Sequence, residues 1–334
     1  MPSFRSGIVE EILSERAGIQ RVLVDGERAY VLTSQIGDVA IGDRVVVNTT
    51  AVDLGLGTGG WHVVHWNLSR EAWSSPGPGH IMKLRYTSLQ ADTGALEEDD
   101  DPGLDLAGTP VVACSLHSQV PLVASRFLDH HPDGRVVYVM TDGAALPLAL
   151  SDLVVAMVEA GVVHATITAG HAFGGDREAV SVPSAIAAAV SLDRADLVVV
   201  GMGPGVVGTD TALGTTAVEV ASVLDAVAAL GGRPICCVRA SGADGRPRHR
   251  GASHHVDTIL RLTRSRVEVA TVEGAAVDAP AHDVHVIDSG DVPASIAARG
   301  LRVTSMGRGP EDDPLFYASA GAAGVLAATP ADGR

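Results

Sequence analysis

The 334-residue sequence contains few aromatic residues and few cysteines, and both shortages restrict the kind of protein that it can form. Aromatic residues make up only 3% of the chain and hydrophobic residues 46%, so the core has to be built from Val, Ala, Leu and Ile. This mixture is typical of parallel sheets covered by helices on both faces. Three cysteines cannot form a disulfide framework, and we expect buried thiols in a reducing compartment.

The sequence is also short of positive charge and of long apolar runs. It has 24 Lys and Arg against 40 Asp and Glu, which gives a net charge of -16. Nucleic-acid binding is therefore not expected, because the phosphate backbone requires a broad basic surface. No run is long enough to cross a bilayer, and the first residues, MPSFRSGIVEE, lack the apolar core of a signal peptide. We expect a cytoplasmic protein with no membrane partner.

The first part of the chain has the pattern of a small β-domain. Residues 1–75 contain short β-type runs between Gly and Asp turns, which predict an antiparallel barrel: SGIVEEIL, QRVLVDG, RAYVLTS, DRVVVNTTAV and WHVVHW. Residues 76–108 hold Pro76, Pro78, one extended segment and the acidic run EEDDDPGLD. We interpret them as a linker between two domains.

Residues 109–330 alternate apolar strands with Ala-rich helical stretches, which predicts a doubly wound, mostly parallel, Rossmann-like α/β domain. The predicted strands are PVVACSL, RVVYVMT, HATITAG, DLVVVGMG, RPICCVRA, VEVATV, VHVID and LRVTSM. The predicted helices cover residues 146–160, 182–191, 216–230, 254–264 and 314–328. In such sheets, ligands bind beyond the carboxyl ends of the strands, so we expect the site at that edge.

A glycine-rich loop follows the strand DLVVVGMG. Gly203, Gly205 and Gly208 allow close backbone approach and Thr209 adds a hydroxyl, so the loop is a candidate cradle for an anion. The alternative is that the glycines only let a strand turn into a helix. The loop lacks the P-loop lysine, and no acidic-ended strand follows to complete a dinucleotide fingerprint.

A second cluster, HAFGGD, follows the strand HATITAG and contains His171 and Asp176. Imidazole and carboxylate are common metal ligands, and His117 and Asp142 follow other predicted strands. We assign His117 and Asp176 as candidate metal ligands, and His171 and Asp142 as candidate acid or base groups. A histidine at a strand end is also a common hydrogen-bonded turn residue, and this alternative stays open.

The stretch RHRGASHHVD, residues 248–257, crowds two arginines and three imidazoles at the predicted start of one helix. Ser253 is placed to cap that helix, but cations at its positive end are unfavourable without an anionic partner. We expect Arg250 to bind an anion, His254 to act in catalysis and His255 to bind a metal. The alternatives are an internal partner, a carboxylate from HAFGGD or from residues 311–313, and a solvated turn. Adjacent helical residues diverge by about 100 degrees, so at most one of these histidines is expected to bind the metal directly.

Several stretches in order along the chain resemble a bacterial family called domain of unknown function 3866: NTTAVDLGLGTGG, GPGHIMKLRYT, VMTDGAALPLALSD, GHAFGGDREAV, GMGPGVVGT and RHRGASHH. The resemblance implies a bacterial cytosolic protein and no particular activity. From the residues we expect an enzyme, a hydrolase or group transferase for a small anionic or phosphorylated metabolite, assisted by a divalent zinc or manganese ion. A non-catalytic metabolite-binding sensor or scaffold protein is the alternative, and a homodimer is expected.

Overall fold

The computed structural model describes residues 2–57 and 59–330 and divides the chain into two compact units, Met1–Gly94 and Ala95–Arg334. The division falls inside residues 76–108, the segment predicted as a linker. Most of that segment belongs to the first unit, where β6 (Met82–Lys83) and β7 (Ala91–Asp92) form a small hairpin. Each unit has its own hydrophobic core.

The first unit is a closed five-stranded barrel, as predicted, with the strand order β1-β2-β3-β5-β4. Its pairings are antiparallel, as expected, except that of β3 with β5, which is parallel. Its strands are β1 (Phe4–Arg16), β2 (Ile19–Val24), β3 (Glu27–Leu32), β4 (Arg44–Asn48) and β5 (His62–Asn67). Short helices α1 (Thr33–Ile36) and α2 (Thr50–Asp53) connect them. Inward-facing side chains, mostly valines, fill the barrel, because successive residues of a strand point to opposite faces.

The second unit is built on an eight-stranded sheet, and every pairing in it is parallel. Its order is β11-β10-β9-β12-β8-β13-β16-β17. The strands are β8 (Pro110–Cys114), β9 (Val136–Thr141), β10 (Ala165–Ala169), β11 (Arg177–Ala179), β12 (Leu197–Met202), β13 (Arg233–Cys237), β16 (Glu268–Thr271) and β17 (Asp283–Val286). The α/β fold class is confirmed.

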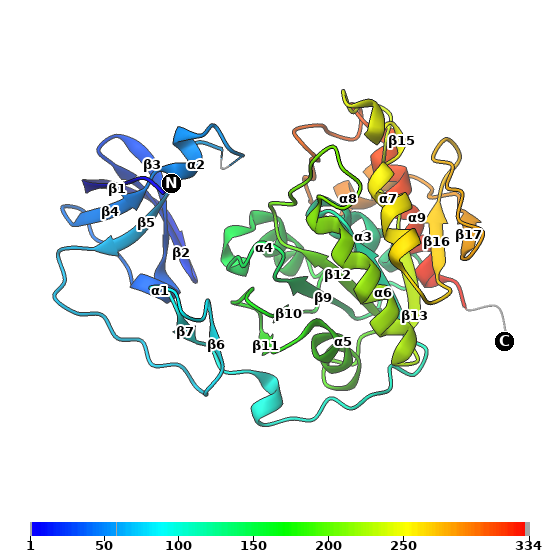
Figure 1. Cartoon of the computed structure of the whole chain (residues 1–334), viewed down its shortest axis with the longest axis horizontal. Helices are drawn as coiled ribbons and strands as arrows, with labels where there is room; N and C mark the ends of the chain where they lie inside the picture. The colour runs from blue at the N-terminus through cyan, green and yellow to red at the C-terminus, as the bar shows by residue number, and fades with distance from the viewer. Residues whose placement is uncertain (1, 58, 331–334) are drawn as a thin grey trace. The chain divides into compact units, whose positions relative to one another are not determined.

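Helices cover both faces of this sheet, as Figure 1 shows. α5 (Val182–Ser191), α6 (Glu219–Ala229) and α7 (His254–Leu262) pack together on one face. α3 (Val120–His130), α8 (Val292–Ala298) and α9 (Pro314–Ala328) pack together on the other. α4 (Asp152–Glu159) joins β9 to β10. The chain leaves β8 toward α3 and leaves β12 and β13 toward α6 and α7, so neighbouring strand ends send their loops to opposite faces. Ligand crevices form at such divergences.

Two details of the sheet differ from the predicted strands. The predicted strand LRVTSM is not a strand: in this segment only Ser305 forms an isolated bridge, with Arg308. The short edge strand β11 was not predicted, because its three residues, Arg177–Ala179, follow a glycine turn and are too few to show a period. No helix in the described part of the chain has the length and apolar character that crossing a bilayer requires.

The helices α3 and α9 approach so closely that glycine is required between them. A Cβ atom added at Gly324 would collide with the backbone carbonyl oxygen of Val123 and lie 3.1 Å from the Cβ of Arg126. A backbone atom cannot swing away as a flexible side chain can. The contact therefore depends on the missing side chain at this position.

We predict that Gly324→Ala lowers the free energy of unfolding by about 1–3 kcal/mol, because overpacking of the helix contact outweighs the better helix propensity of alanine. Gly245→Ala is the matched control, since an added Cβ there meets nothing within 4 Å. Urea denaturation of both variants followed by circular dichroism measures the difference. Equal stabilities of the two variants would contradict the close packing.

Candidate functional site

Three histidines lie together where the chain runs from β13 to α7. After β13, the short strands β14 (Ala240–Ser241) and β15 (Gly251–Ala252) pair as an antiparallel ribbon. The connection between them carries the 3-10 turn η5 (Pro247–His249). The ribbon folds the chain back on itself, so His249 returns to the first turn of α7, where His254 and His255 begin the helix.

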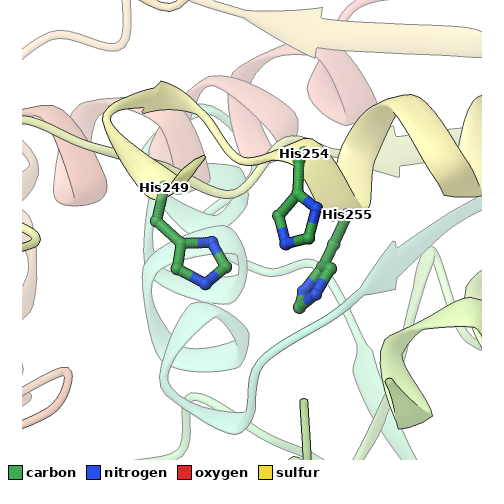
Figure 2. A group of neighbouring side chains, drawn as sticks. All are labelled: His249, His254 and His255. Carbon is green, nitrogen blue, oxygen red and sulfur yellow. The ribbon is translucent and has the colours of Figure 1, made fainter. Parts of the chain in front are cut away.

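The three imidazoles face a common space, as Figure 2 shows. One ring nitrogen from each lies within 4.8 Å of those from the other two. The ring centroids of His254 and His255 are 4.2 Å apart, and His249 lies 5.1 Å from each of them. The divergence expected for adjacent helical residues is not seen here. Both rings lean toward His249 at the first turn of the helix.

Ser253 fixes this arrangement. It is fully buried and caps α7, where its Oγ accepts a hydrogen bond from the backbone N–H of His255 at 3.3 Å. The same hydroxyl lies 2.7 Å from Nδ1 of His249. One ring nitrogen of His249 is thus engaged by serine, and the other is left for a ligand. A hydrogen bond of this kind orients metal-binding histidines.

The other two imidazoles have buried nitrogens without a hydrogen-bond partner in the described part of the chain. These atoms are both ring nitrogens of His255 and Nε2 of His254. His249 and His255 are each only 2% exposed, so water has little access to them. An unsatisfied buried polar group costs about 1–3 kcal/mol. Three such atoms in one cluster leave hydrogen-bonding capacity that a bound ligand would satisfy.

The histidines are held in the neutral form that a metal ion requires. Burial, together with the charges of Arg239 and Arg246, lowers the pKa of His249 to about 3. Burial and the neighbouring His254 lower the pKa of His255 to about 4, and burial and Arg248 also lower the pKa of His254. All three rings are therefore uncharged at neutral pH. Neutral imidazole is the ligand form for zinc and similar ions.

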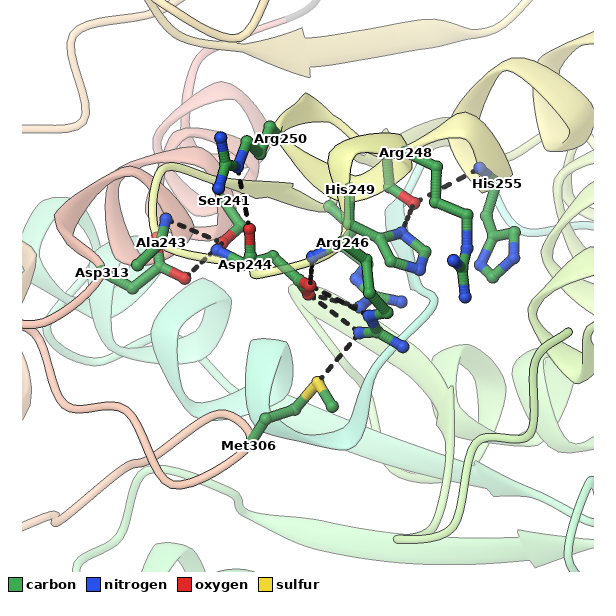
Figure 3. A network of polar contacts seen from close by, with 12 residues as sticks. Ser241, Ala243, Asp244, Arg246, Arg248, His249, Arg250, His255, Met306 and Asp313 are labelled. Atoms are coloured by element: carbon green, nitrogen blue, oxygen red, sulfur yellow. Dashed lines mark hydrogen bonds and ion pairs between the residues drawn. The ribbon is translucent and has the colours of Figure 1, made fainter. Parts of the chain in front are cut away.

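Several arginines surround the cluster, and one buried carboxylate holds most of them. Asp244 accepts two hydrogen bonds from the guanidinium of Arg246, at 2.9 and 2.8 Å, as Figure 3 shows. Nη2 of Arg239 and Nη2 of Arg308 each lie 3.8 Å from Oδ2 of the same carboxylate. The hydrogen bond from Arg246 holds the pKa of Asp244 well below its usual range. Asp244 therefore stays ionised and anchors the arginines.

Arg239 has the weakest pairing with a carboxylate among these arginines. Its residue is only 8% exposed, and its guanidinium makes no hydrogen bond to any part of the chain that the structure describes. The ion pair with Asp244 is long, and Asp244 already serves Arg246. Burial and the charge of Arg246 lower the pKa of Arg239 to about 10, so it remains charged at neutral pH. A buried, poorly paired cation favours an anion beside it.

The glycine-rich loop after β12 contacts this cluster. A Cβ added at Gly208 would lie 3.0 Å from Cε1 of His255, so this position is close to the ring. Asp210 of the same loop pairs with Arg248 at 2.7 Å. The loop's hydroxyls bond within the loop: Oγ1 of Thr209 lies 2.9 Å from that of Thr211 and 3.1 Å from the Gly214 carbonyl oxygen. The loop thus lies against the ring of His255, but the hydroxyl of Thr209 is engaged by hydrogen bonds within the loop itself.

Other residues predicted for anion binding lie in different surroundings. An added Cβ at Gly203 would meet Sδ of Met140 at 3.1 Å, and Gly205 has a φ of 114°, so both serve the turn after β12. Arg250 is exposed, and its Nε donates to the carbonyl oxygen of Asp244 at 3.0 Å (Figure 3). Besides burial, the charges of three other arginines, Arg239, Arg246 and Arg248, help to lower the pKa of the histidines.

The structure brings His171 and Asp142 together at a different part of the same edge. Oδ2 of Asp142 accepts a hydrogen bond from the backbone N–H of His171 at 3.1 Å. Asp176 accepts bonds from the backbone and hydroxyl of Thr166, at 2.8 and 2.9 Å, and so fastens its turn to β10. Three strands lie between β10 and β13, which separates their ends by about 19 Å at ordinary strand spacing.

His117 lies after the central strand β8 with both ring nitrogens engaged. Nδ1 is 3.2 Å from the Tyr138 hydroxyl, and Nε2 is 2.7 Å from Oγ of Ser151. Burial lowers the pKa of His117 to about 4, so the ring is neutral and satisfied at neutral pH. In this arrangement neither nitrogen has a lone pair directed at an outside ligand.

The sequence interpretation left out His249 and the arginines that surround it. His249 stands in the stretch RHRGASHH, and the crowding of three imidazoles was its signal. What could not be read was the ribbon of β14 and β15 that folds His249 back onto α7. Arg239 and Arg246 stand in the same connection as Asp244, but Arg308 comes from the segment between α8 and α9, and nothing in its local sequence indicates that it reaches Asp244.

A family model described as "Protein of unknown function (DUF3866)" matches residues 28–324, nearly the whole chain. The resemblance seen in the sequence motifs is thereby confirmed. No curated protein matches the sequence.

We predict that His117→Gln reduces the loss of folding stability that occurs when the pH is lowered. The pKa of His117 is about 4 in the folded protein and about 6.5 in an unfolded chain, so the unfolded state binds the proton more tightly. Stability is therefore lost as the pH falls from 6.5 toward 4, by about 3 kcal/mol at most from this group. Glutamine does not titrate, so the variant should lose less stability than the wild type over that range.

Denaturant unfolding at pH 7 and pH 4.5 measures the effect. His130→Gln is the control, because His130 is exposed at the end of α3. The interpretation of His117 is wrong if the wild type and His117→Gln lose the same free energy of unfolding between the two pH values.

Proposed function

Since the chain belongs to the DUF3866 family, whose description assigns no activity, we propose its function from the site: His249, His254 and His255 bind one divalent metal ion, zinc or manganese. We further propose that the protein is an enzyme that hydrolyses, or transfers a group from, a small anionic metabolite. The arginines around the histidines attract the anion. The single observation that carries the proposal is the set of buried, unpartnered imidazole nitrogens.

The residues fit a metal centre in number and chemical state. Three neutral histidines leave at least one coordination position for water or substrate, which is the pattern of catalytic rather than structural zinc. Ligand nitrogens around zinc are about 3.4 Å apart for bonds of about 2.05 Å, so the present separation closes with small ring rotations. Such an ion lowers the pKa of a bound water and polarises an oxygen of the substrate.

The chain's own residues have separate tasks in this proposal. Ser253 orients His249, and Gly208 leaves room for the ring of His255. His254 becomes a ligand, beside its expected catalytic role. His171 and Asp142 stay candidate acid or base groups, for a substrate long enough to reach from one part of the edge to the other. The assignments of Gly203, Gly205, Thr209, Arg250, His117 and Asp176 as binding groups have less support from their contacts.

A non-catalytic metabolite sensor is the second candidate. The observation that favours it is the distance along the sheet edge between His171 and the three histidines, because catalysis by an acid and base pair needs both at hydrogen-bond reach. Either function is compatible with the cytoplasm, where the free thiols of Cys114, Cys236 and Cys237 stay reduced. A homodimer also remains our expectation.

We predict that the wild type, after loading with zinc and gel filtration, retains about one ion per chain, as a three-histidine centre requires. His249→Ala, His254→Ala and His255→Ala should each lower the zinc affinity by at least about 10-fold, because each removes one ligand. Elemental analysis gives the stoichiometry, and the visible spectrum of the cobalt-substituted protein reports the ligand geometry independently of activity.

His164→Ala is the matched control for metal binding, since His164 is exposed just before β10. Equal zinc contents in the wild type and all three site variants would rule out this centre. Turnover of para-nitrophenyl esters by the loaded protein, lost in His254→Ala, supports the enzyme. Metal binding without turnover of any ester tested favours the sensor.

A further inference from the structure

We propose that Arg239, Arg246 and Arg248 form a binding site for a phosphate group beside the three histidines, so that the substrate is a phosphorylated metabolite and Arg239 is its principal anchor. The inference concerns the site of the proposed function and adds the substrate class. It stands on the arginines alone and can be tested without a metal ion.

The first argument is the position of Arg239. It follows β13 directly, and its backbone carbonyl oxygen accepts a hydrogen bond from the N–H of Ser253, the cap of α7, at 2.9 Å. The next residue, Ala240, pairs with Ala252 in the ribbon of β14 and β15, directly before that cap. The guanidinium shares the carboxylate of Asp244 with Arg246, in the connection of the ribbon that also carries His249. Arg239 therefore lies at the start of α7 and belongs to the same ribbon as the first of the three histidines.

The second argument is that the guanidinium of Arg239 is largely buried and poorly paired. It makes no hydrogen bond to the described residues, and its Nη2 lies 3.8 Å from Oδ2 of Asp244, beyond hydrogen-bond distance. A guanidinium in such a place keeps little hydration and has no close anionic partner. An oxyanion that accepts two parallel N–H bonds restores it, and this planar fork suits phosphate and carboxylate oxygens.

The third argument is the local charge balance. Four arginines, Arg239, Arg246, Arg248 and Arg308, share three carboxylates. Asp313 forms an ion pair with Arg308 at 3.1 Å, and the exposed Asp210 forms one with Arg248. Asp244 alone is left for both Arg239 and Arg246. Among these ion pairs one guanidinium has no carboxylate of its own, while Asp257, in the first turn of α7, complements the positive end of that helix.

These features favour phosphate over a single carboxylate. A phosphate monoester carries between 1.5 and 2 negative charges at pH 7 and presents three acceptor oxygens, according to its second pKa of about 6. Two or three guanidiniums can engage separate oxygens of a tetrahedral group. A carboxylate offers two oxygens and one charge, and leaves one of the arginines without a partner.

The experiment is calorimetric titration of inorganic phosphate into the full-length, chelator-treated protein at fixed ionic strength. The wild type should bind one phosphate per chain, and acetate at least about 10-fold more weakly, because acetate lacks the second charge. Arg239→Met should weaken phosphate binding by about 30-fold or more, the loss of a buried charged contact. Arg261→Met is the control and should change it less than about 2-fold, since Arg261 is exposed in the last turn of α7.

Arg239→Lys keeps the positive charge but removes the planar pair of N–H donors of the guanidinium. This variant is used for the test if Arg239→Met fails to fold. It should weaken phosphate binding by about 5-fold or more. Equal losses in the Arg239 and Arg261 variants, or acetate binding as tight as phosphate binding, would overturn the proposal. Phosphate binding that depends on Arg239 without any zinc binding would refute the metal centre and leave this inference standing. Zinc binding without phosphate binding would support the metal centre and refute the phosphate site.

Discussion

A single buried hydroxyl, that of Ser253, determines the geometry of the candidate site. It caps α7 and bonds Nδ1 of His249, so it joins the loop after β13 to the first turn of the helix. The ribbon of β14 and β15 brings His249 back to the helix, and the hydrogen bond to Ser253 then sets the orientation of its ring toward His254 and His255. The cap that the sequence indicated for structural reasons is therefore also the element that assembles the three imidazoles.

A second constraint is the distribution of charge around Asp244. The chain as a whole is strongly acidic, with a net charge of -16, yet the segment next to the histidines collects arginines. Asp244 is almost fully buried and holds Arg246 tightly while leaving Arg239 and Arg308 at 3.8 Å. Burial, together with the positive charge of the arginines, lowers the pKa of the imidazoles and keeps them neutral. The same positive charge favours an anion, so the arginines contribute both to the metal-binding and to the anion-binding character of the site.

The fold was largely predictable because it depends on local periodicity. Helices α5 and α9 begin and end at the predicted residues, since apolar spacing and a proline in the first turn define them. The predicted strand LRVTSM was wrong: its apolar residues Leu301 and Val303 are buried, but the segment pairs with none of the described strands, and the sheet ends at β17. A short apolar run does not by itself decide between a strand and a packed loop.

The sequence predicted where the candidate site lies, at the carboxyl edge of the sheet, but not which residues form it. His117 and His249 look alike in the sequence, each a histidine in a loop after a buried strand. The partners decide between them: Tyr138 and Ser151 satisfy both nitrogens of His117, whereas Ser253 engages only one nitrogen of His249. These partners lie 21 and 34 residues from His117, so no local pattern reveals them.

The sheet order gives the last constraint on mechanism. β8, β12 and β9 separate the end of β13 from that of β10, so the edge carries two polar groups of residues rather than one. One group has neutral imidazoles and unpaired cationic charge, and the other has His171 hydrogen-bonded through its backbone to Asp142. A compact ligand held by the histidines and arginines cannot also contact His171. Any reaction on such a ligand therefore has to take its proton acceptor from the histidine cluster itself or from a water that the cluster binds.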